Sequence, residues 1–161
     1  MMKTLAAVAL MAVQFLGMNA HAQSVGSALD VQAYAMNGER FSAKQVEGKV
    51  SIVFFWSTTC AVCRDSLPEL RANLAGWANK PFALVTVNVD RTPNDWLSYE
   101  RILAQTKAPT KGLISVRQDD GKALPAKLPM TLLIDTKGKV VRRYDGRVAP
   151  EAWDDVAELL L

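Results

Sequence analysis

A nearly continuous apolar stretch, residues 49–56, limits the possible folds of this chain more than any other feature. Its sequence, "KVSIVFFW", is rich in β-branched and aromatic residues and follows a glycine, a pattern typical of a strand covered on both faces. From Cys60 to about Asn79 the apolar positions recur at helical spacing. Pro68 lies inside this pattern and is expected to kink the helix, because proline has no backbone N–H to donate. A buried strand that leads directly into a helix predicts an α/β fold, with a sheet flanked by helices.

The remaining segments alternate between strand and helix patterns. A short strand with a turn at Asn37-Gly38 precedes the apolar strand, and residues 82–90 form the next one. A helix then starts at Thr92, which is followed by a proline at the first helical position. A further strand is expected from residue 113 to a turn at Asp120-Gly121. A hairpin at residues 130–135 and 139–146 and a last helix from Pro150 onward complete the order. The order β-β-α-β-α-β-β-β-α predicts one α/β domain whose central sheet contains both parallel and antiparallel pairs.

Residues 1–22 have the pattern of a secretory signal peptide. They contain a lysine at Lys3, an apolar run from Leu5 to about Leu16, and the sequence Ala20-His21-Ala22, whose small residues suit a cleavage site. We therefore expect cleavage after Ala22, a single domain over residues 23–161, and a periplasmic location. An uncleaved anchor and a core helix are the alternatives, but the apolar run is shorter than the roughly 20 residues of a spanning helix.

The chain has two cysteines, Cys60 and Cys63, and one histidine, His21. In an oxidising compartment, two thiols this close in sequence are expected to form a disulfide. Metal binding is not expected, because the histidine leaves with the leader and two sulfur ligands do not complete a zinc or copper site. A net charge of +3, from 19 basic and 16 acidic residues, favours neither nucleic acid nor an anionic membrane as a partner.

The position of the two cysteines suggests a reactive pair. Cys60 is expected at the first turn of a helix, where unpaired backbone N–H groups favour a thiolate. The thiolate is the nucleophile of disulfide exchange, and a second sulfur within reach can release the mixed disulfide. Cys63, one turn further into the helix, meets that requirement and is expected to be the resolving thiol.

Three stretches of the chain resemble a known family. Trp56, Cys60, Cys63 and Pro68 form the pattern "WxxxCxxCxxxxP", which resembles the active-site helix of thioredoxins. The lead-in "NGERFSAKQVEGKVSIVFFWSTTC" and the later segment "LPMTLLIDTKGKVV" resemble the exported TlpA/ResA-like branch of the redoxins. The resemblance covers roughly residues 28–161.

This resemblance implies a thioredoxin-like fold and a thiol–disulfide oxidoreductase in which Cys60 attacks and Cys63 resolves. It implies that Pro129 is cis and packs beside the disulfide, that the Leu128 backbone offers hydrogen bonds to an extended substrate, and that Trp56 forms a wall of the site. The expected partners are protein clients with dithiols or disulfides, together with a membrane electron donor. No cofactor, metal or nucleic acid is expected, and the protein is expected to be a monomer.

The chain also departs from the family pattern. Thr59 replaces the aromatic residue that usually precedes the first cysteine, and Phe54 stands where thioredoxins carry a buried acid. Ser66 stands where some cytochrome-maturation reductases carry a glutamate. Asp65 or a water remains as a candidate for activating the resolving thiol. The segment 121–129 is short, so a helix usual there is expected to be reduced to a turn.

Two other interpretations remain open on the sequence alone. The first is a dithiol oxidase or isomerase on the same fold. The second is a binding module that uses the groove near Pro129, with an inert structural disulfide.

The residues between the cysteines bear on the redox poise of the pair. Ala61-Val62 places no cation between the cysteines, which predicts a mildly to moderately reducing couple. Arg64 lies just beyond and is expected to be solvated.

Overall fold

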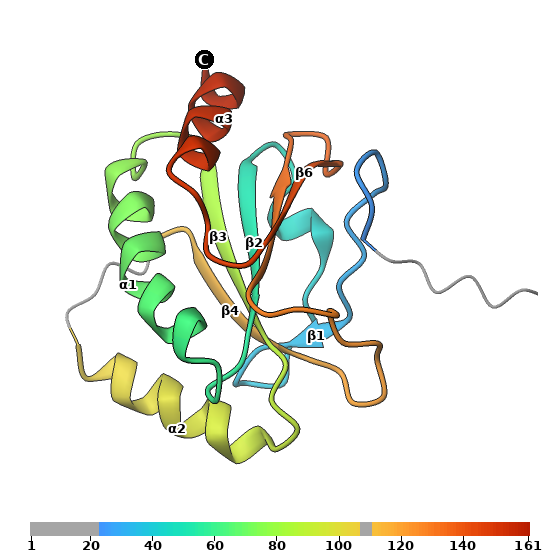
Figure 1. Cartoon of the computed structure of the whole chain (residues 1–161), viewed down its shortest axis with the longest axis vertical. Coiled ribbons are helices and arrows are strands. Elements are labelled where there is room, and N and C mark those ends of the chain that lie inside the picture. Colours follow the sequence, from blue (N-terminus) through green and yellow to red (C-terminus); the bar gives the residue numbers. More distant parts are fainter. Residues whose placement is uncertain (1–22, 107–110) are drawn as a thin grey trace, which may run out of the picture.

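The computed structural model describes residues 23–106 and 111–161, and Figure 1 shows its arrangement. The expected signal peptide, with His21, lies outside the described residues. In chain order the elements are β1 (Ala33–Tyr34), the 3₁₀ helix η1 (Ala43–Gln45), β2 (Val50–Trp56), α1 (Ala61–Gly76), β3 (Phe82–Asn88), α2 (Pro93–Ala104), β4 (Leu113–Gln118), β5 (Met130–Ile134), β6 (Val140–Asp145) and α3 (Glu151–Leu160). The α/β fold expected from the sequence is therefore confirmed.

A six-stranded mixed sheet with the order β1-β4-β3-β2-β5-β6 forms the centre of the molecule. The strands β2, β3 and β4 are parallel to one another, whereas β1, β5 and β6 join as antiparallel neighbours. In the parallel register Trp56 is opposite Asn88, and Asn88 is opposite Arg117. The carboxyl ends of these three strands therefore meet at one edge, where the loops that follow them lie close together.

All three described α-helices contribute to the same hydrophobic cluster, on one face of the sheet. The connections β2-α1-β3 and β3-α2-β4 cross in the same direction along the sheet, and right-handed crossovers in one direction place both helices on one face. Figure 1 shows α1 and α2 on the same side of β3 and β4. The buried residues of α1 that face the sheet are Cys63, Ser66, Leu67, Leu70 and Leu74.

The other face of the sheet is covered by the segment before β2 rather than by an α-helix. Leu29, Ala33, Phe41 and Val46 are buried there, and they pack with inward-facing residues of β2, β3 and β5. The strand β2 is therefore buried on both faces, and all seven of its residues are buried. This double coverage explains why its sequence is an unbroken apolar run.

The predicted boundaries agree closely with the structure. Thr92 is the N-cap of α2 and Pro93 its first residue, and Pro68 lies inside α1 with an exposed ring. Residues 121–129 contain no helix, and the Leu128–Pro129 peptide bond is cis, as the resemblance implied. No helix within the described ranges is long and apolar enough to cross a membrane.

Candidate active site

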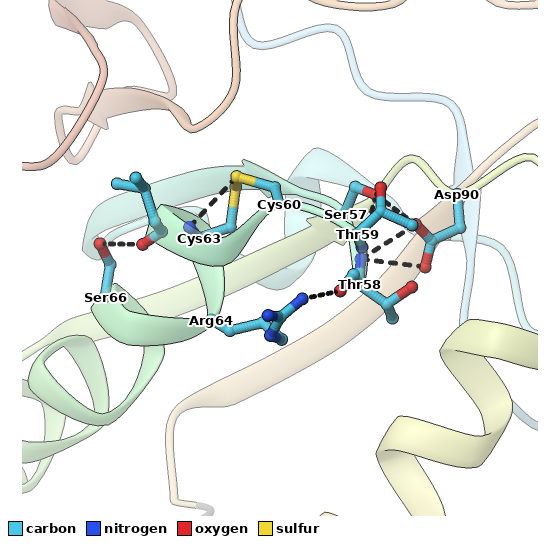
Figure 2. Close-up of a disulfide and its surroundings, with 9 residues drawn as sticks. Ser57, Thr58, Thr59, Cys60, Cys63, Arg64, Ser66 and Asp90 are labelled. Carbon is cyan, nitrogen blue, oxygen red and sulfur yellow. Dashed lines mark hydrogen bonds between the residues drawn. A yellow bond between two sulfur atoms is a disulfide. The ribbon is translucent and has the colours of Figure 1, made fainter.

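Cys60 and Cys63 form a disulfide at the start of α1, with an S–S distance of 2.12 Å and a Cα–Cα distance of 5.2 Å. Cys60 is the N-cap residue of the helix, and its Sγ accepts a hydrogen bond from the backbone N–H of Cys63 at 3.1 Å (Figure 2). Cys60 is partly exposed, whereas Cys63 is completely buried. The outer sulfur therefore lies where a helix N-terminus stabilises negative charge, and the inner sulfur is protected from solvent.

The turn before Cys60 is held by a buried carboxylate. Asp90, which follows β3, accepts hydrogen bonds from the Ser57 hydroxyl at 2.5 Å and from the Thr58 backbone N–H at 2.9 Å. Its other oxygen accepts from the Asn88 side chain at 2.9 Å. Figure 2 shows Asp90 facing residues 57–59 from the neighbouring strand end. Asp90 thus fixes the turn that presents the outer sulfur.

The same turn is held from the opposite side by Arg64. Its guanidinium donates to the carbonyl oxygen of Thr58, whereas Asp90 accepts from the N–H of Thr58. A positive and a negative side chain therefore bind the two peptide groups of one residue (Figure 2). Arg64 is exposed, as expected, and its hydrogen bond to the turn was not predicted from the sequence.

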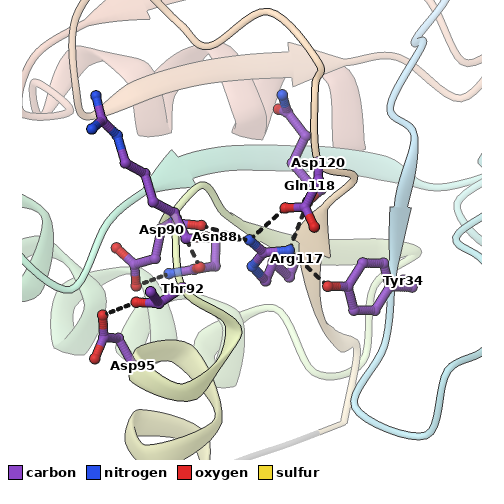
Figure 3. A network of polar contacts seen from close by, with 9 residues as sticks. Tyr34, Asn88, Asp90, Thr92, Asp95, Arg117, Gln118 and Asp120 are labelled. Carbon is purple, nitrogen blue, oxygen red and sulfur yellow. Dashed lines mark hydrogen bonds and ion pairs between the residues drawn. The ribbon is translucent and has the colours of Figure 1, made fainter.

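A second network continues from Asp90 to the edge of the sheet (Figure 3). Arg117, on β4, donates to the backbone carbonyl oxygen of Asp90 at 2.9 Å and to that of Arg91 at 3.1 Å. It also donates to the Tyr34 hydroxyl of β1 and pairs with Asp120, each at 2.7 Å. The guanidinium therefore ties two strands to the loop that carries Asp90.

Sequence reasoning missed both Asp90 and Arg117. Asp90 is 32 residues from Thr58 and 33 from Ser57 in the chain, so the contacts depend on how β2 and β3 pair. One signal was available: an acid directly after a strand parallel to the catalytic strand lies at the same edge of the sheet. Arg117 stands in the middle of a strand pattern, where nothing marks it as buried.

The residues expected around the disulfide are buried or partly buried, and their roles at the site stay predictions. Trp56, Cys60, Cys63 and Leu128 belong to one hydrophobic cluster, and Pro129 is buried at the start of β5. Trp56 is 1% exposed, and its ring centroid lies 4.7 Å from that of Tyr99. The indole is therefore packed inside the molecule, and its role as a wall of the substrate site stays a prediction.

The positions without the family acids are filled by other contacts. Phe54 is fully buried among apolar residues, and the Ser66 hydroxyl donates to the Val62 carbonyl oxygen at 2.8 Å. Asp65 is exposed. Within the two described ranges, no three His, Cys, Asp or Glu side chains lie close enough to share a metal ion.

Comparison with known proteins places this site in a family. A family model described as AhpC/TSA matches residues 25–156. The thiol-disulfide oxidoreductase ResA of Bacillus subtilis is 25% identical over 130 residues, covering 77% of this chain and 68% of that protein. ResA of Halalkalibacterium halodurans is 23% identical, covering 78% of this chain and 70% of that protein.

Solved structures share the fold. A thiol:disulfide interchange protein from Bacteroides sp. superimposes with a TM-score of 0.67 at 22% identity, over 85% of this chain and 90% of that one. The thioredoxin-like fold predicted from the sequence is thus confirmed. Because the family model spans most of the sequence and the ResA proteins match over the same domain, the chain belongs to the AhpC/TSA family, with the thioredoxin-like fold of its TlpA/ResA-like members.

Proposed function

We propose that this protein is a periplasmic thiol–disulfide oxidoreductase that reduces disulfides in client proteins. The observation that carries the proposal is the asymmetry of the pair: Cys60 is partly exposed at a helix N-terminus, and Cys63 is buried one turn further in. An attacking thiolate needs access to its client, and the resolving thiol needs only access to the attacking sulfur.

The reaction has two exchanges. The Cys60 thiolate attacks one sulfur of the client disulfide, so that a mixed disulfide forms and the other client sulfur leaves as a thiolate that takes a proton. The Cys63 thiolate then attacks Cys60 Sγ, the Cys60–Cys63 disulfide forms, and the second client sulfur leaves. The client gains two electrons and two protons, and the protein loses them. A dithiol electron donor, which we place in the membrane, must return it to the reduced form.

The loop before β5 supports the binding of an extended client segment. The backbone N–H and C=O of Leu128 make no hydrogen bond with any described residue, and Leu128 packs in the same cluster as the cysteines. Free backbone groups beside a reactive sulfur can pair with the main chain of a client, as in strand addition. Such pairing would hold the client disulfide next to Cys60 without selecting its side chains.

Reduction of insulin by the protein, with dithiothreitol as the electron source, tests the attacking role of Cys60. We expect the Cys60→Ser variant to fall to the uncatalysed rate, because no second exposed thiol replaces the lost nucleophile. The Cys63→Ser variant, reduced beforehand and mixed with insulin after removal of dithiothreitol, should instead accumulate a mixed disulfide that mass spectrometry identifies. A Cys60→Ser protein as fast as the wild type would rule out this mechanism.

The direction of electron flow needs a separate measurement. Equilibration with glutathione buffers gives the reduction potential of the pair. We expect the pair to be largely oxidised by buffers that leave a dithiol oxidase reduced, because neither residue between the cysteines carries a positive charge. A potential in the range of oxidases would instead favour the oxidase or isomerase alternative.

A further inference from the structure

A cavity of about 200 Å³ opens at the carboxyl ends of β3 and β4. Its wall consists of residues 89–91 after β3, residues 117–122 at the end of β4, and Leu124. The Leu124 side chain is 55% exposed. The shortened segment 121–129, which has no helix, forms the outer part of this wall. The cavity is large enough for one side chain of a bound polypeptide.

Asp90 links this cavity to the disulfide. It lines the cavity, and its carboxylate holds Ser57 and Thr58, the latter two residues before Cys60. Leu124 lies on the segment that leads into the Leu128–Pro129 bond. The cavity therefore shares Asp90 with the network that holds the turn before Cys60, and it shares Leu124 with the segment that leads to Pro129.

The acidic groups in the wall are all engaged. The Asp90 carboxylate accepts from Ser57, Thr58 and Asn88. Asp119 pairs with Arg40, and Asp120 pairs with Arg117 at 2.7 Å (Figure 3). The charges of Asp119 and Asp120 are thus compensated by arginines, whereas Asp90 keeps its negative charge and, within the described ranges, accepts from neutral donors only.

Two of the three basic groups in the wall lack an ion pair among the described residues. Arg91 and Lys122 are exposed, and neither pairs with a described acid. Arg117 is 2% exposed and pairs with Asp120, although its Nε has no hydrogen-bond partner among the described residues. Since Asp90 is the one wall carboxylate without a cationic partner in the described part of the chain, these two exposed cations leave a net positive charge around the cavity, beside the exposed Leu124.

We propose that this cavity is a client subsite that takes the carboxylate side chain of a Glu or Asp near the client's disulfide. Arg91 and Lys122 attract the carboxylate, and Leu124 packs against the methylene groups of the same side chain. The inference rests on the proposed function, and it adds a preference for acidic client segments. Such a preference changes substrate affinity and encounter, and it leaves the exchange chemistry at the sulfurs unchanged.

Oxidised peptides of identical sequence, except for one residue next to the attacked cysteine, test this preference. The residue is Glu, Gln or Lys, and reduction by the full-length protein is followed as kcat and KM. We expect kcat/KM to fall in the order Glu, Gln, Lys, with about two- to fivefold for each step, because exposed ion pairs are worth that much. The difference should lie in KM and shrink at high ionic strength, because salt screens exposed charges.

Charge reversal supplies the decisive comparison. The double variant Arg91→Glu/Lys122→Glu should reverse the order of the Glu and Lys peptides. The control Lys44→Glu/Lys137→Glu changes the net charge equally at two exposed lysines outside the cavity wall, and it should keep the wild-type order. Free succinate is tested as an inhibitor of the same reaction. An inhibition constant for succinate equal to the KM of the Glu peptide would show a small-anion site and overturn the subsite.

Two further outcomes separate this inference from the proposed function. Equal kcat/KM for all three peptides, or the same loss of preference in both double variants, would overturn the subsite and leave the oxidoreductase proposal intact. If the wild-type protein and the Cys60→Ser variant both reduce the peptides no faster than the uncatalysed reaction, the proposed function is overturned, and the subsite with it.

Discussion

At the scale of single residues, Asp90 connects the reactive sulfur to the rest of the fold. The Asp90 residue is 7% exposed, and its carboxylate binds the turn before Cys60. Arg64 binds the same turn from the other side. The two side chains fix the turn at Thr58, whose backbone groups would otherwise need water. The placement of the attacking cysteine therefore depends on a residue from a different strand.

Asp90→Ala should lower the free energy of unfolding by about 1–3 kcal/mol, because the buried Thr58 N–H and Ser57 hydroxyl lose their acceptor. Urea unfolding of the oxidised protein measures the change. Asp90→Asn, which keeps one acceptor oxygen, should cost less than the alanine variant.

Asp65→Ala is a matched control, since Asp65 is an exposed acid close to the same cysteines. It should change the free energy of unfolding by less than about 0.5 kcal/mol. Equal losses from Asp90→Ala and Asp65→Ala would contradict a structural role of the Asp90 contacts. Unchanged insulin reduction by Asp65→Ala would also remove Asp65 as the group that activates Cys63.

At the scale of secondary-structure elements, the contact between β6 and α3 fixes the carboxyl-terminal end of the chain. The Tyr144 hydroxyl of β6 donates to the Asp155 carboxylate of α3 at 2.5 Å. Burial, and then the hydrogen bond and charge of Asp155, raise the pKa of Tyr144 well above its ordinary value. The neutral phenol is therefore the form that the folded protein prefers.

This raised pKa predicts a loss of stability in alkaline solution. The pKa of Tyr144 is higher in the folded protein than in the unfolded chain. Its contribution to the free energy of unfolding is therefore complete below about pH 10 and is lost as the pH rises further. Between pH 9 and pH 11 the free energy of unfolding of the wild type should fall more steeply than that of Tyr144→Phe. Burial also raises the pKa of Tyr99, and this contribution is common to both proteins. Parallel curves for the two proteins would contradict the assignment.

The elements themselves were predictable from the sequence, and their contacts were only partly so. The buried strand β2, the N-cap at Thr92 and the hairpin of β5 and β6 follow from apolar patterns and turn residues that are local in the chain. The disulfide position and the cis bond before Pro129 followed from motifs. The contact of Asp90 with Thr58 could not be read this way, because it depends on the register between strands. The same limit applies to Arg117, whose partners Tyr34, Asp90 and Arg91 come from two segments distant in sequence.

At the scale of the whole molecule, the redox state of one disulfide is linked to the stability of the entire fold. The folded and unfolded chains each have a reduction potential for the Cys60–Cys63 pair, and the difference between them equals the difference in stability between the oxidised and reduced proteins. A folded pair that is more reducing than the unfolded one therefore makes the oxidised protein the more stable form.

The proposed reducing direction predicts that the oxidised protein is more stable than the reduced one by about 1–4 kcal/mol, corresponding to a potential difference of roughly 20–90 mV. Urea unfolding of the oxidised protein and of the protein kept in excess dithiothreitol measures this difference. A Cys60→Ala/Cys63→Ala variant serves as the control, since dithiothreitol should not alter its unfolding. A reduced protein more stable than the oxidised one would indicate an oxidase instead.

The segment before β2 completes the core on the face without α-helices, and this has a consequence for biogenesis. Leu29 and Ala33 share that core with Val116 and Val140, and β1 pairs with β4 through residues 33–34 and 117–118. A chain is synthesised amino end first, so residues 29–34 cannot close this layer until β4 and β6 have been made. The segment before β2 must therefore wait for strands from the second half of the chain before it can cover this face of the sheet.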